Sequence, residues 1–323
     1  MSGIKQHIIP KFILKNFAFC ENNKKKINIY SRDRASYSDN IKEVETGDYF
    51  YTFSKGNDAD PTITNLENSY SNLLAKISKL ENKQRVKDER VSNFVAHLCM
   101  RTRTLRQLFY LSSDYGLQTL IDYISDPKIF DQLFLATISP KDWRYEYLVK
   151  NRKIIMVQIK SYLETFKDQS LEESIKLGHV NTLTDPDHFY SRSNRYKELN
   201  WIMVRTDSPL IIGDSVCLFE VHLSGVNRSH FKIIDDLNEN VKNIFVPLST
   251  YRLLLGTRSE NLSINIDEIN EMIAKCSEHH FFSQIKTSHF DNLAYFIGNN
   301  ASLINYEYIQ NIVNNIINEW TNA

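Results

Sequence analysis

The feature that most constrains the fold is a change of pattern along the chain, from long helical periodicity to short β-rich runs. Apolar side chains recur at helical spacing over residues 63–80 and again from about Val86 to Phe109. The short polar segment 82–84 between these stretches predicts an antiparallel helical pair. Residues 200–256 instead carry short β-branched or aromatic runs bounded by turns, which is typical of a sheet. The sequence therefore predicts an α+β protein, a mainly helical body with a small, mostly antiparallel sheet.

The remaining segments fit one domain over residues 1–323. Further helices are predicted over residues 116–177, with breaks near Pro127 and Pro140, and then over residues 267–285 and 304–320. Residues 178–198 are polar and rich in turn formers, so they predict a loop or linker. Strand-like runs at residues 27–30 and 48–53 are candidates to complete the sheet. The expected sub-regions are an N-terminal helix with strands over 1–60, a helical part over 61–177, a β-rich part over 200–256 and C-terminal helices over 265–323.

Composition excludes several function classes. Lys+Arg and Asp+Glu are equal at 39 each, so the 323-residue chain has no global basic field of the kind that attracts nucleic acid. The usual glycine-rich phosphate loop, dinucleotide fingerprint and nucleophile elbow are missing. The four cysteines are far apart, which argues against a zinc ribbon or a disulfide scaffold. No apolar stretch approaches the length of a membrane span and no secretory pattern is visible, so a cytoplasmic protein without membrane contact is expected.

The opening segment is the most informative motif for function. His7 precedes Pro10, and Pro10 opens an apolar stretch with Phe12, Leu14 and Phe17. Because proline fits the first turn of a helix, His7 is expected just outside a helix start, among unpaired backbone donors. That position suits a catalytic or anion-contacting imidazole. It equally suits a histidine that only caps the helix.

Two residues of the predicted helical pair are further candidates. Glu67 lies at the margin of the first apolar stripe, where it is either an acid facing a cleft or the last member of a capping box formed with Thr64. Arg101 lies on one edge of the second stripe with Arg90 and His97. An arginine there either contacts phosphate or merely extends along an apolar surface towards solvent. The segment 76–106 holds nine Lys and Arg residues against three acids, which predicts a basic outer surface.

Asp214 follows the run Leu210-Ile211-Ile212-Gly213, which reads as a strand ending at a glycine. A carboxylate at the end of a strand is a common catalytic arrangement, because the scaffold fixes its position. Strand alternation would place Asp214, Glu220 and His222 on one face, which suggests a metal-dependent nuclease. Polar residues on a solvated strand face are the alternative interpretation.

The opening block resembles the bacterial family known as domain of unknown function 4238, whose members begin with an H-x-x-P-x-F-x-L-x-x-F pattern. Later features occur in the family's order, including the Arg101-Thr102 pair, a tryptophan at position 201, an aspartate turn at position 214 and a Pro-Leu-Ser step at position 247. This chain departs from the family where it has Ser215-Val216 in place of Asn-Pro. The resemblance covers roughly residues 6–285. It implies a cytosolic bacterial protein with His7, Arg101 and Asp214 as suspected functional positions, and it carries no established activity.

The functional hypothesis from the sequence is a metal-assisted nuclease or other hydrolase of a phage-defence or toxin system. His7 would act as general base or as a ligand of a divalent metal, and Asp214 as a second metal ligand. Glu67 would be a second acid and Arg101 a phosphate clamp. The alternative is a non-enzymatic sensor that holds nucleic acid or a partner on the basic surface of residues 76–106. Mutual proximity of the four residues in one pocket is the requirement that separates a catalytic site from scattered polar groups.

Overall fold

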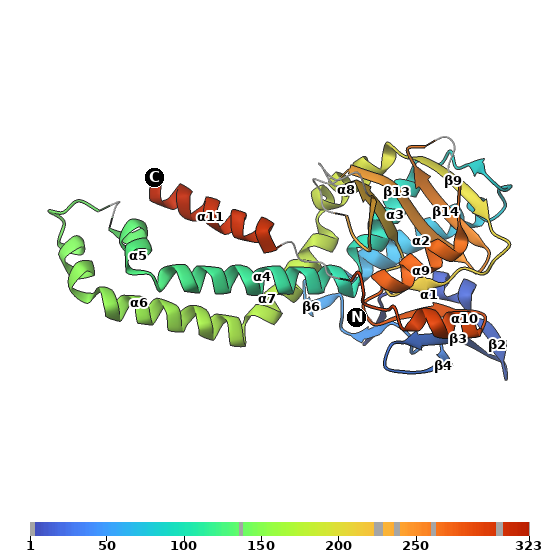
Figure 1. Cartoon of the computed structure of the whole chain (residues 1–323), viewed down its shortest axis with the longest axis horizontal. Helices are drawn as coiled ribbons and strands as arrows, with labels where there is room; N and C mark the ends of the chain where they lie inside the picture. The colour runs from blue at the N-terminus through green and yellow to red at the C-terminus, as the bar shows by residue number, and fades with distance from the viewer. Residues whose placement is uncertain are drawn as a thin grey trace. The chain divides into compact units, whose positions relative to one another are not determined.

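The computed structural model describes residues 4–135, 138–222, 229–235, 240–259, 263–301 and 306–322. Its contacts divide the chain into two compact units. The mixed unit comprises Met1–Leu105 and Gly178–Ser302, and the helical unit comprises Arg106–Leu177 and Leu303–Ala323. Figure 1 shows helices and strands together in the mixed unit and helices in the helical unit. The expectation of one domain over 1–323 stays a prediction.

The mixed unit contains a six-stranded antiparallel sheet in the order β12-β11-β13-β14-β9-β8. Its central strands are almost fully buried, because Leu253, Leu254 and Leu255 of β14 and Ile244 of β13 are inaccessible to solvent. Helix α9 packs against β11 and β12. The strands are β8 (Gln84–Arg85), β9 (Asn200–Arg205), β11 (Leu218–His222), β12 (Ser229–Lys232), β13 (Asn240–Ser249) and β14 (Arg252–Thr257).

A second antiparallel sheet joins segments that are far apart in the sequence. Its order is β10-β15-β3-β2, and β4 also pairs with β3. These strands are β2 (Phe19–Glu21), β3 (Lys24–Ser31), β4 (Arg34–Asn40), β10 (Ile212–Gly213) and β15 (His280–Ser283). Two short ribbons complete the set, β1 (Lys5–His7) with β5 (Thr46–Asp48) and β6 (Thr52–Ser54) with β7 (Asn57–Asp58).

The fold-class prediction therefore needs a correction. The chain combines helices and antiparallel sheets, as in an α+β protein, but the expectation of one small sheet is wrong because the described residues form sheets of six and five strands as well as the two ribbons. The run at residues 27–30 does not extend the sheet of residues 200–256. It pairs with β15, which the sequence pattern had placed in a helix. Long-range pairing of this kind leaves no local signal.

Several helices differ from their predicted bounds. The stretch from Val86 to Phe109 is two helices, α3 (Arg90–Met100) and α4 (Arg103–Ile124), broken at Arg101-Thr102. The predicted helix over 267–285 ends early, since α9 spans Ile266–Cys276. The predicted loop over 178–198 is helical, because α7 (Leu171–Thr184) is followed by α8 (Pro186–Lys197). Asp185 caps α8 and Pro186 begins it, a start signal that also resembles a turn.

The other helices of the mixed unit are either short or lie where the apolar periodicity of the sequence predicts a helix. They are α1 (Lys11–Leu14), with the short turn η1 (Lys15–Phe17), α2 (Asp60–Ile77) and α10 (Ser288–Ala294). Pro10 is the N-cap of α1, as the opening motif predicts. Asn16 fixes this opening segment to the sheet through a 2.9 Å hydrogen bond from its amide to the Leu248 carbonyl of β13.

The helical unit consists of most of α4, α5 (Pro127–Phe134), α6 (Trp143–Gln169), the first half of α7, and α11 (Tyr306–Asn322). Its breaks fall near Pro127 and Pro140, as predicted. Asp126 and Asp142 cap α5 and α6 by accepting backbone N–H groups of Lys128 and Arg144. Among the described residues, no helix is both long and apolar enough to span a membrane.

Candidate functional site

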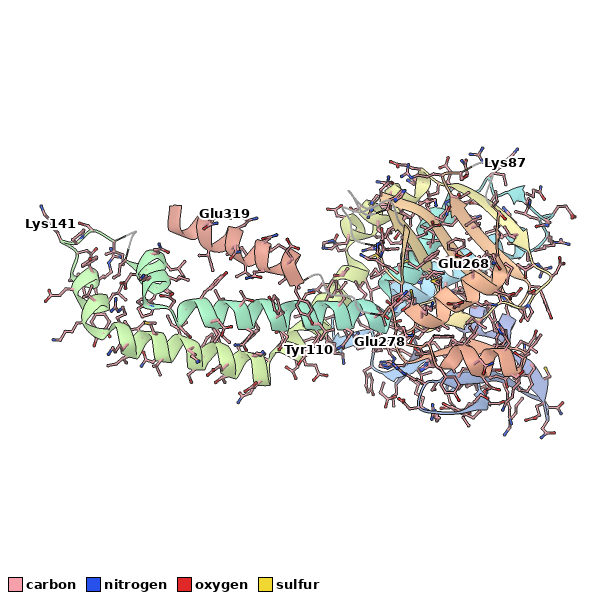
Figure 2. The ribbon with its side chains drawn as sticks, in the orientation of Figure 1. Lys87, Tyr110, Lys141, Glu268, Glu278 and Glu319 are labelled. Atoms are coloured by element: carbon pink, nitrogen blue, oxygen red, sulfur yellow. The ribbon has the colours of Figure 1, made fainter. Side chains whose placement is uncertain are left out.

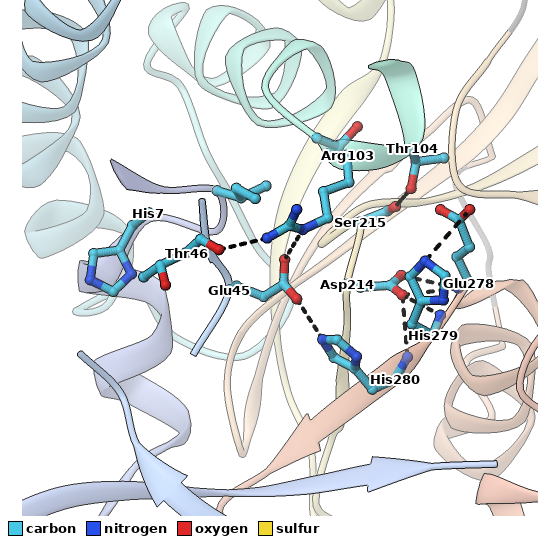
Figure 3. A network of polar contacts seen from close by, with 12 residues as sticks. His7, Glu45, Thr46, Arg103, Thr104, Asp214, Ser215, Glu278, His279 and His280 are labelled. Atoms are coloured by element: carbon cyan, nitrogen blue, oxygen red, sulfur yellow. Dashed lines mark hydrogen bonds and ion pairs between the residues drawn. The ribbon is translucent and has the colours of Figure 1, made fainter. Parts of the chain in front are cut away.

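A cluster of ionisable side chains lies in the mixed unit where four segments meet (Figure 3). The segments are the turn before β5, the start of α4, the turn between β10 and β11, and the start of β15. They contribute Glu45, Arg103, Asp214 and His280, with Glu278 and His279 just before the strand. The side chains therefore come from positions spread over more than two hundred residues of sequence.

Glu45 is the buried acid of this cluster, with a side chain that is 4% exposed. It ends the turn before β5 in a left-handed backbone conformation, with φ at 48°. Its Oε1 atom lies 2.5 Å from Nε2 of His280. Its Oε2 atom is buried and has no hydrogen-bond partner among the described residues, and the nearest cation is Nε of Arg103 at 3.6 Å. One carboxylate oxygen therefore retains its capacity to accept a proton or a hydrogen bond.

The Glu45 contact changes the acidity of His280. Burial alone lowers the pKa of this imidazole, but the hydrogen bond and the negative charge of Glu45 outweigh burial and raise the pKa above its ordinary value of 6.5. The nearby Asp214 carboxylate acts in the same direction. The His280 side chain is 23% exposed, so the imidazole is reachable from solvent, whereas Glu45 lies behind it. A histidine with this environment holds a proton near neutral pH and can release it.

Arg103 supplies the exposed cation of the cluster. Its Nη2 atom donates to the Thr46 carbonyl at 2.6 Å, and its guanidinium lies over the Phe50 ring at 5.4 Å. These contacts fix the direction of a side chain that is 42% exposed. The arginine is held on one edge and remains open to solvent over much of its surface, which suits contact with an anion.

Asp214 organises the segment that carries the histidines. Its carboxylate accepts backbone N–H groups of Glu278 at 3.0 Å, His279 at 2.7 Å and His280 at 3.3 Å. Burial raises its pKa, and the charge of Glu45 adds to that effect. Burial likewise raises the pKa of Glu278, with a contribution from the charge of Asp214. The carboxylates of Glu45, Asp214 and Glu278 thus lie near the start of β15, where negative charge disfavours the ionisation of Asp214 and Glu278. Perturbed acidities of this kind are typical of functional sites.

The turn that presents Asp214 is strained. Val216 has φ at 59°, a region that β-branched residues rarely occupy. The turn is fastened to the start of α4 by the Ser215 and Thr104 hydroxyls, which lie 2.6 Å apart. Gly213 is required on the other side, because a Cβ atom there would lie 2.6 Å from Oγ of Ser277. Strain that the surroundings maintain is often found where a side chain must be held in place.

Three of the four sequence-predicted site residues are brought together in an adjoining network. Arg101 is 2% exposed, forms an ion pair with Glu67 and donates to the backbone carbonyl of His7. Its Nε also donates to the Tyr51 hydroxyl at 3.2 Å. Asp214 belongs to the Glu45–His280 cluster instead. The two networks meet at the β1–β5 ribbon, where His7 pairs with Thr46, the residue after Glu45.

His7 lies at the end of β1, three positions before Pro10, the N-cap of α1. Burial, followed by the charge of Lys11, lowers its pKa, while a hydrogen bond to the Val44 backbone opposes this effect. Its Nδ1 atom is buried and has no well-aligned hydrogen-bond partner among the described residues. Figure 3 shows His7 beside Thr46 in the same close view as Glu45.

Two interpretations of the sequence need correction. Helix α2 begins at Asp60, so Thr64 lies inside the helix and cannot cap it, and Glu67 pairs with Arg101 instead. The strand alternation that grouped Asp214 with Glu220 and His222 is interrupted by the turn at residues 214–217, since β11 starts only at Leu218. Glu220 accepts a 2.7 Å hydrogen bond from Lys242 on the neighbouring strand, and His222 is exposed.

The donor atoms of the described residues do not suit a metal ion. No group of three or more His, Cys, Asp or Glu side chains in the described part of the chain is placed to hold one. Both oxygens of Asp214 also accept backbone N–H groups. We therefore derive no step through a metal, and the metal-binding roles expected for His7 and Asp214 stay predictions.

Sequence reasoning missed Glu45, Arg103 and His280. Arg103 has a signal, since it belongs to the same Arg-Thr-Arg-Thr segment as Arg101. His280 falls within the helix predicted over residues 267–285, whereas in the structure it begins β15. Its partner lies 235 positions away, on a turn without a recognisable pattern.

Comparison with known proteins places the chain in a family. The family model described as "Protein of unknown function (DUF4238)" matches residues 5–318, nearly the whole chain. The chain belongs to this family. The DUF4238 match includes every residue of the Glu45–His280 cluster and of the Arg101 network, and it confirms the resemblance to this family. A search of curated proteins and a search of solved structures each found no match.

Proposed function

We propose that this DUF4238 protein is a hydrolase of phosphate esters, and specifically a nuclease, with Glu45, His280 and Arg103 as its reacting groups. The observation that carries the proposal is the buried Glu45 carboxylate, which binds His280 through one oxygen and leaves the other without a hydrogen-bond partner among the described residues, beside Arg103. General acid–base catalysis requires a base, an acid and an anion contact within mutual reach.

In the proposed reaction Oε2 of Glu45 accepts a proton from a water molecule, and the water oxygen attacks phosphorus. The P–O bond to the leaving alcohol breaks, and His280 protonates the leaving oxygen through Nδ1, the ring nitrogen that Glu45 does not contact. The products are a phosphate monoester and an alcohol. Glu45 then holds a proton that His280 lacks, and their 2.5 Å contact provides a direct path to return it.

Arg103 supports the choice of a phosphate ester. Charge develops on the non-bridging oxygens during phosphoryl transfer, and a planar guanidinium is the side chain best shaped to contact two of them. Asp214 acts as a positioning residue in this mechanism, because its three backbone contacts fix the segment that carries His280. The Arg101–Glu67 ion pair holds the β1 strand next to the turn of Glu45.

Hydrolysis of bis(p-nitrophenyl) phosphate and of a labelled single-stranded oligonucleotide tests the proposal. We expect turnover by the wild type and a loss of at least about 100-fold in Glu45→Gln and His280→Gln, the usual contribution of one acid–base group. Glu43→Gln is the matched control. It removes a carboxylate two positions away that is half exposed and pairs with Lys5, so its turnover should be unchanged.

The proposal fails if the folded wild type cleaves neither substrate, or if Glu45→Gln and His280→Gln keep wild-type rates. Circular dichroism of each variant separates lost chemistry from lost structure.

A non-enzymatic nucleic-acid-binding role is the second candidate, favoured by the exposed lysines of the segment 76–106, namely Lys76, Lys79, Lys83 and Lys87. Under this role the wild type binds an oligonucleotide without cleaving it, and His280→Gln leaves that binding unchanged.

A further inference from the structure

Two cavities lie on either side of one short segment in the mixed unit, residues 86–89 between β8 and α3. The first has a volume of about 610 Å³ and lies between this segment and the end of α2. The second has a volume of about 470 Å³ and lies between the same segment, the end of α8 and β9. Both volumes are in the range of roughly 300–1,000 Å³ that is typical of ligand sites. We call the two together the 86–89 groove.

The rim of the 86–89 groove is basic, although the whole chain has no net charge. Lys76 and Lys87 line the first cavity, and Arg85, Lys87 and Lys197 line the second. All of these side chains are exposed. They come from α2, β8, the shared segment and α8, so the tertiary structure collects the charges and no single sequence run supplies them all.

The acids at the rim only partly offset these cations. Asp88 is bound by Arg90 through contacts of 2.9 and 2.6 Å, so its charge is compensated within the pair. Glu89 is the N-cap of α3 and makes no side-chain hydrogen bond to the helix start. The amino end of this 11-residue helix therefore adds positive potential to the groove. Lys79 and Lys83, both exposed, extend the basic surface beyond the first cavity.

The floor of each cavity is apolar. Leu73, Ile77 and Leu80 line the first cavity, and Leu199 and Trp201 line the second. Val86 lines both. A ligand that suits this groove combines flat apolar groups for the floors with anionic groups for the rim, and it extends past one cavity into the next.

The 86–89 groove is separate from the Glu45–His280 cluster. Figure 2 shows Lys87 and Glu278 far apart within the mixed unit. A ligand that contacts the groove therefore has no need to contact the reacting groups, and binding can be measured without turnover.

We propose that the 86–89 groove binds single-stranded nucleic acid, with phosphates on the Lys and Arg rim and unpaired bases over the two apolar floors. Positively charged grooves that track the backbone, with aromatic side chains under the bases, are the usual means of binding a single strand, and Trp201 is the aromatic residue that lines the second cavity. A duplex fits less well, because its bases are stacked inside and cannot reach the floors. Cations that continue beyond one cavity favour a polymer over a free nucleotide. This inference rests on the proposed nuclease function and deepens it by naming the substrate class, single-stranded nucleic acid.

Fluorescence anisotropy of a labelled 12-residue oligothymidylate tests the inference. The probe is titrated with the full-length protein at several salt concentrations. We expect Arg85→Glu/Lys87→Glu to weaken binding at least tenfold. We also expect a shallower salt dependence, by about 0.7 in slope for each phosphate that the variant no longer neutralises. Lys150→Glu/Lys153→Glu on α6 is the matched control, since it makes the same charge change at two exposed positions of the helical unit and should bind as the wild type does.

Three competitors identify the ligand class. Displacement of the probe by unlabelled single strand, but not by an equal nucleotide concentration of duplex or of thymidine monophosphate, supports the inference. Equal displacement by the monophosphate or by duplex overturns it, as does equal weakening in the α6 control. Glu45→Gln keeps full affinity if the inference holds. A wild-type protein that binds the single strand but does not cleave it refutes the proposed function and leaves the groove in place.

Discussion

At the scale of single residues, two arginines two positions apart have opposite environments. Arg101 is 2% exposed and is surrounded by Glu67, Tyr51 and the His7 carbonyl, whereas Arg103 is 42% exposed beside Glu45. The break between α3 and α4 causes this difference, because it turns the two side chains in different directions. We infer that Arg101 stabilises the fold around the site and that Arg103 faces the ligand.

The buried arginine makes a stability prediction. Arg101→Met should lower the free energy of unfolding by about 3–5 kcal/mol, because it leaves the Glu67 carboxylate and the His7 carbonyl without their donor. Urea denaturation measures this change. Arg144→Met removes an exposed arginine that pairs with Asp142 on the surface, and it should leave the unfolding midpoint unchanged. Equal effects of the two substitutions would contradict the assigned role of Arg101.

Some site residues could be predicted from the sequence and others could not. His7, Glu67 and Arg101 were selected by local patterns, and the structure joins them through the Arg101 guanidinium. His7 is expected just outside a helix start, and it lies on a strand that ends three positions before the N-cap of α1. Glu45 could not be predicted, because its partner His280 is 235 positions away and the contact depends on tertiary packing alone.

At the scale of elements, the turn between β10 and β11 determines where the site forms. Gly213 allows this turn to pass close to Ser277 at the end of α9, and Val216 completes it in a left-handed conformation. The same turn places Asp214 against the start of β15. Without this close approach, the backbone that carries His280 would be displaced.

A pair of glycine substitutions tests this requirement. Gly213→Ala should destabilise the protein by about 1–3 kcal/mol, because its Cβ would overlap Oγ of Ser277. It should also reduce phosphodiesterase activity. Gly178→Ala lies inside α7 with no neighbour within 4 Å, so it should instead stabilise by about 0.5–1 kcal/mol. Chemical denaturation of the two variants provides both values. A neutral Gly213→Ala would show that the turn tolerates a side chain.

Helices were easier to predict than sheets for a physical reason. The apolar periodicity of α2 and of the C-terminal α11 is a local property, so both helices were found near their observed bounds. The five-stranded sheet pairs residues near 28 with residues near 283. Pairing between segments so far apart in the sequence is not indicated by any local pattern. Helix α8 was missed although Asp185-Pro186 is a helix start, because the same residues also form turns.

At the scale of the whole molecule, the shifted acidities predict how stability depends on pH. The pKa of His280 is raised in the folded state, so its protonation adds to the free energy of unfolding. This contribution is fully present below about pH 6.5 and is lost as pH rises through the folded-state pKa. Burial also raises the pKa values of Asp214 and Glu278 in the folded state. Their ionisation therefore lowers the free energy of unfolding as pH rises, as the deprotonation of His280 does.

The part of the stability that depends on His280 should therefore fall as pH rises from about 6 to about 8.5, whereas the lowered pKa values of His7 and His97 act in the opposite direction. The difference in Tm between the wild type and Glu45→Gln isolates the His280 contribution and should shrink over this interval, because the variant loses the hydrogen bond and the charge that raise the His280 pKa. Differential scanning calorimetry at constant ionic strength measures both profiles. A difference in Tm that stays constant over this interval would contradict the assigned protonation of the cluster.

The proposed chemistry depends above all on Glu45 and His280 acting as one acid–base pair, and NMR titration of the His280 ring tests this most directly. In the wild type we expect a His280 pKa above 6.5, and in Glu45→Gln a pKa that is lower than in the wild type, because the Glu45 hydrogen bond and charge no longer oppose burial. Glu43→Gln should leave the wild-type value unchanged. A His280 pKa that is the same with and without the Glu45 carboxylate would contradict the pairing.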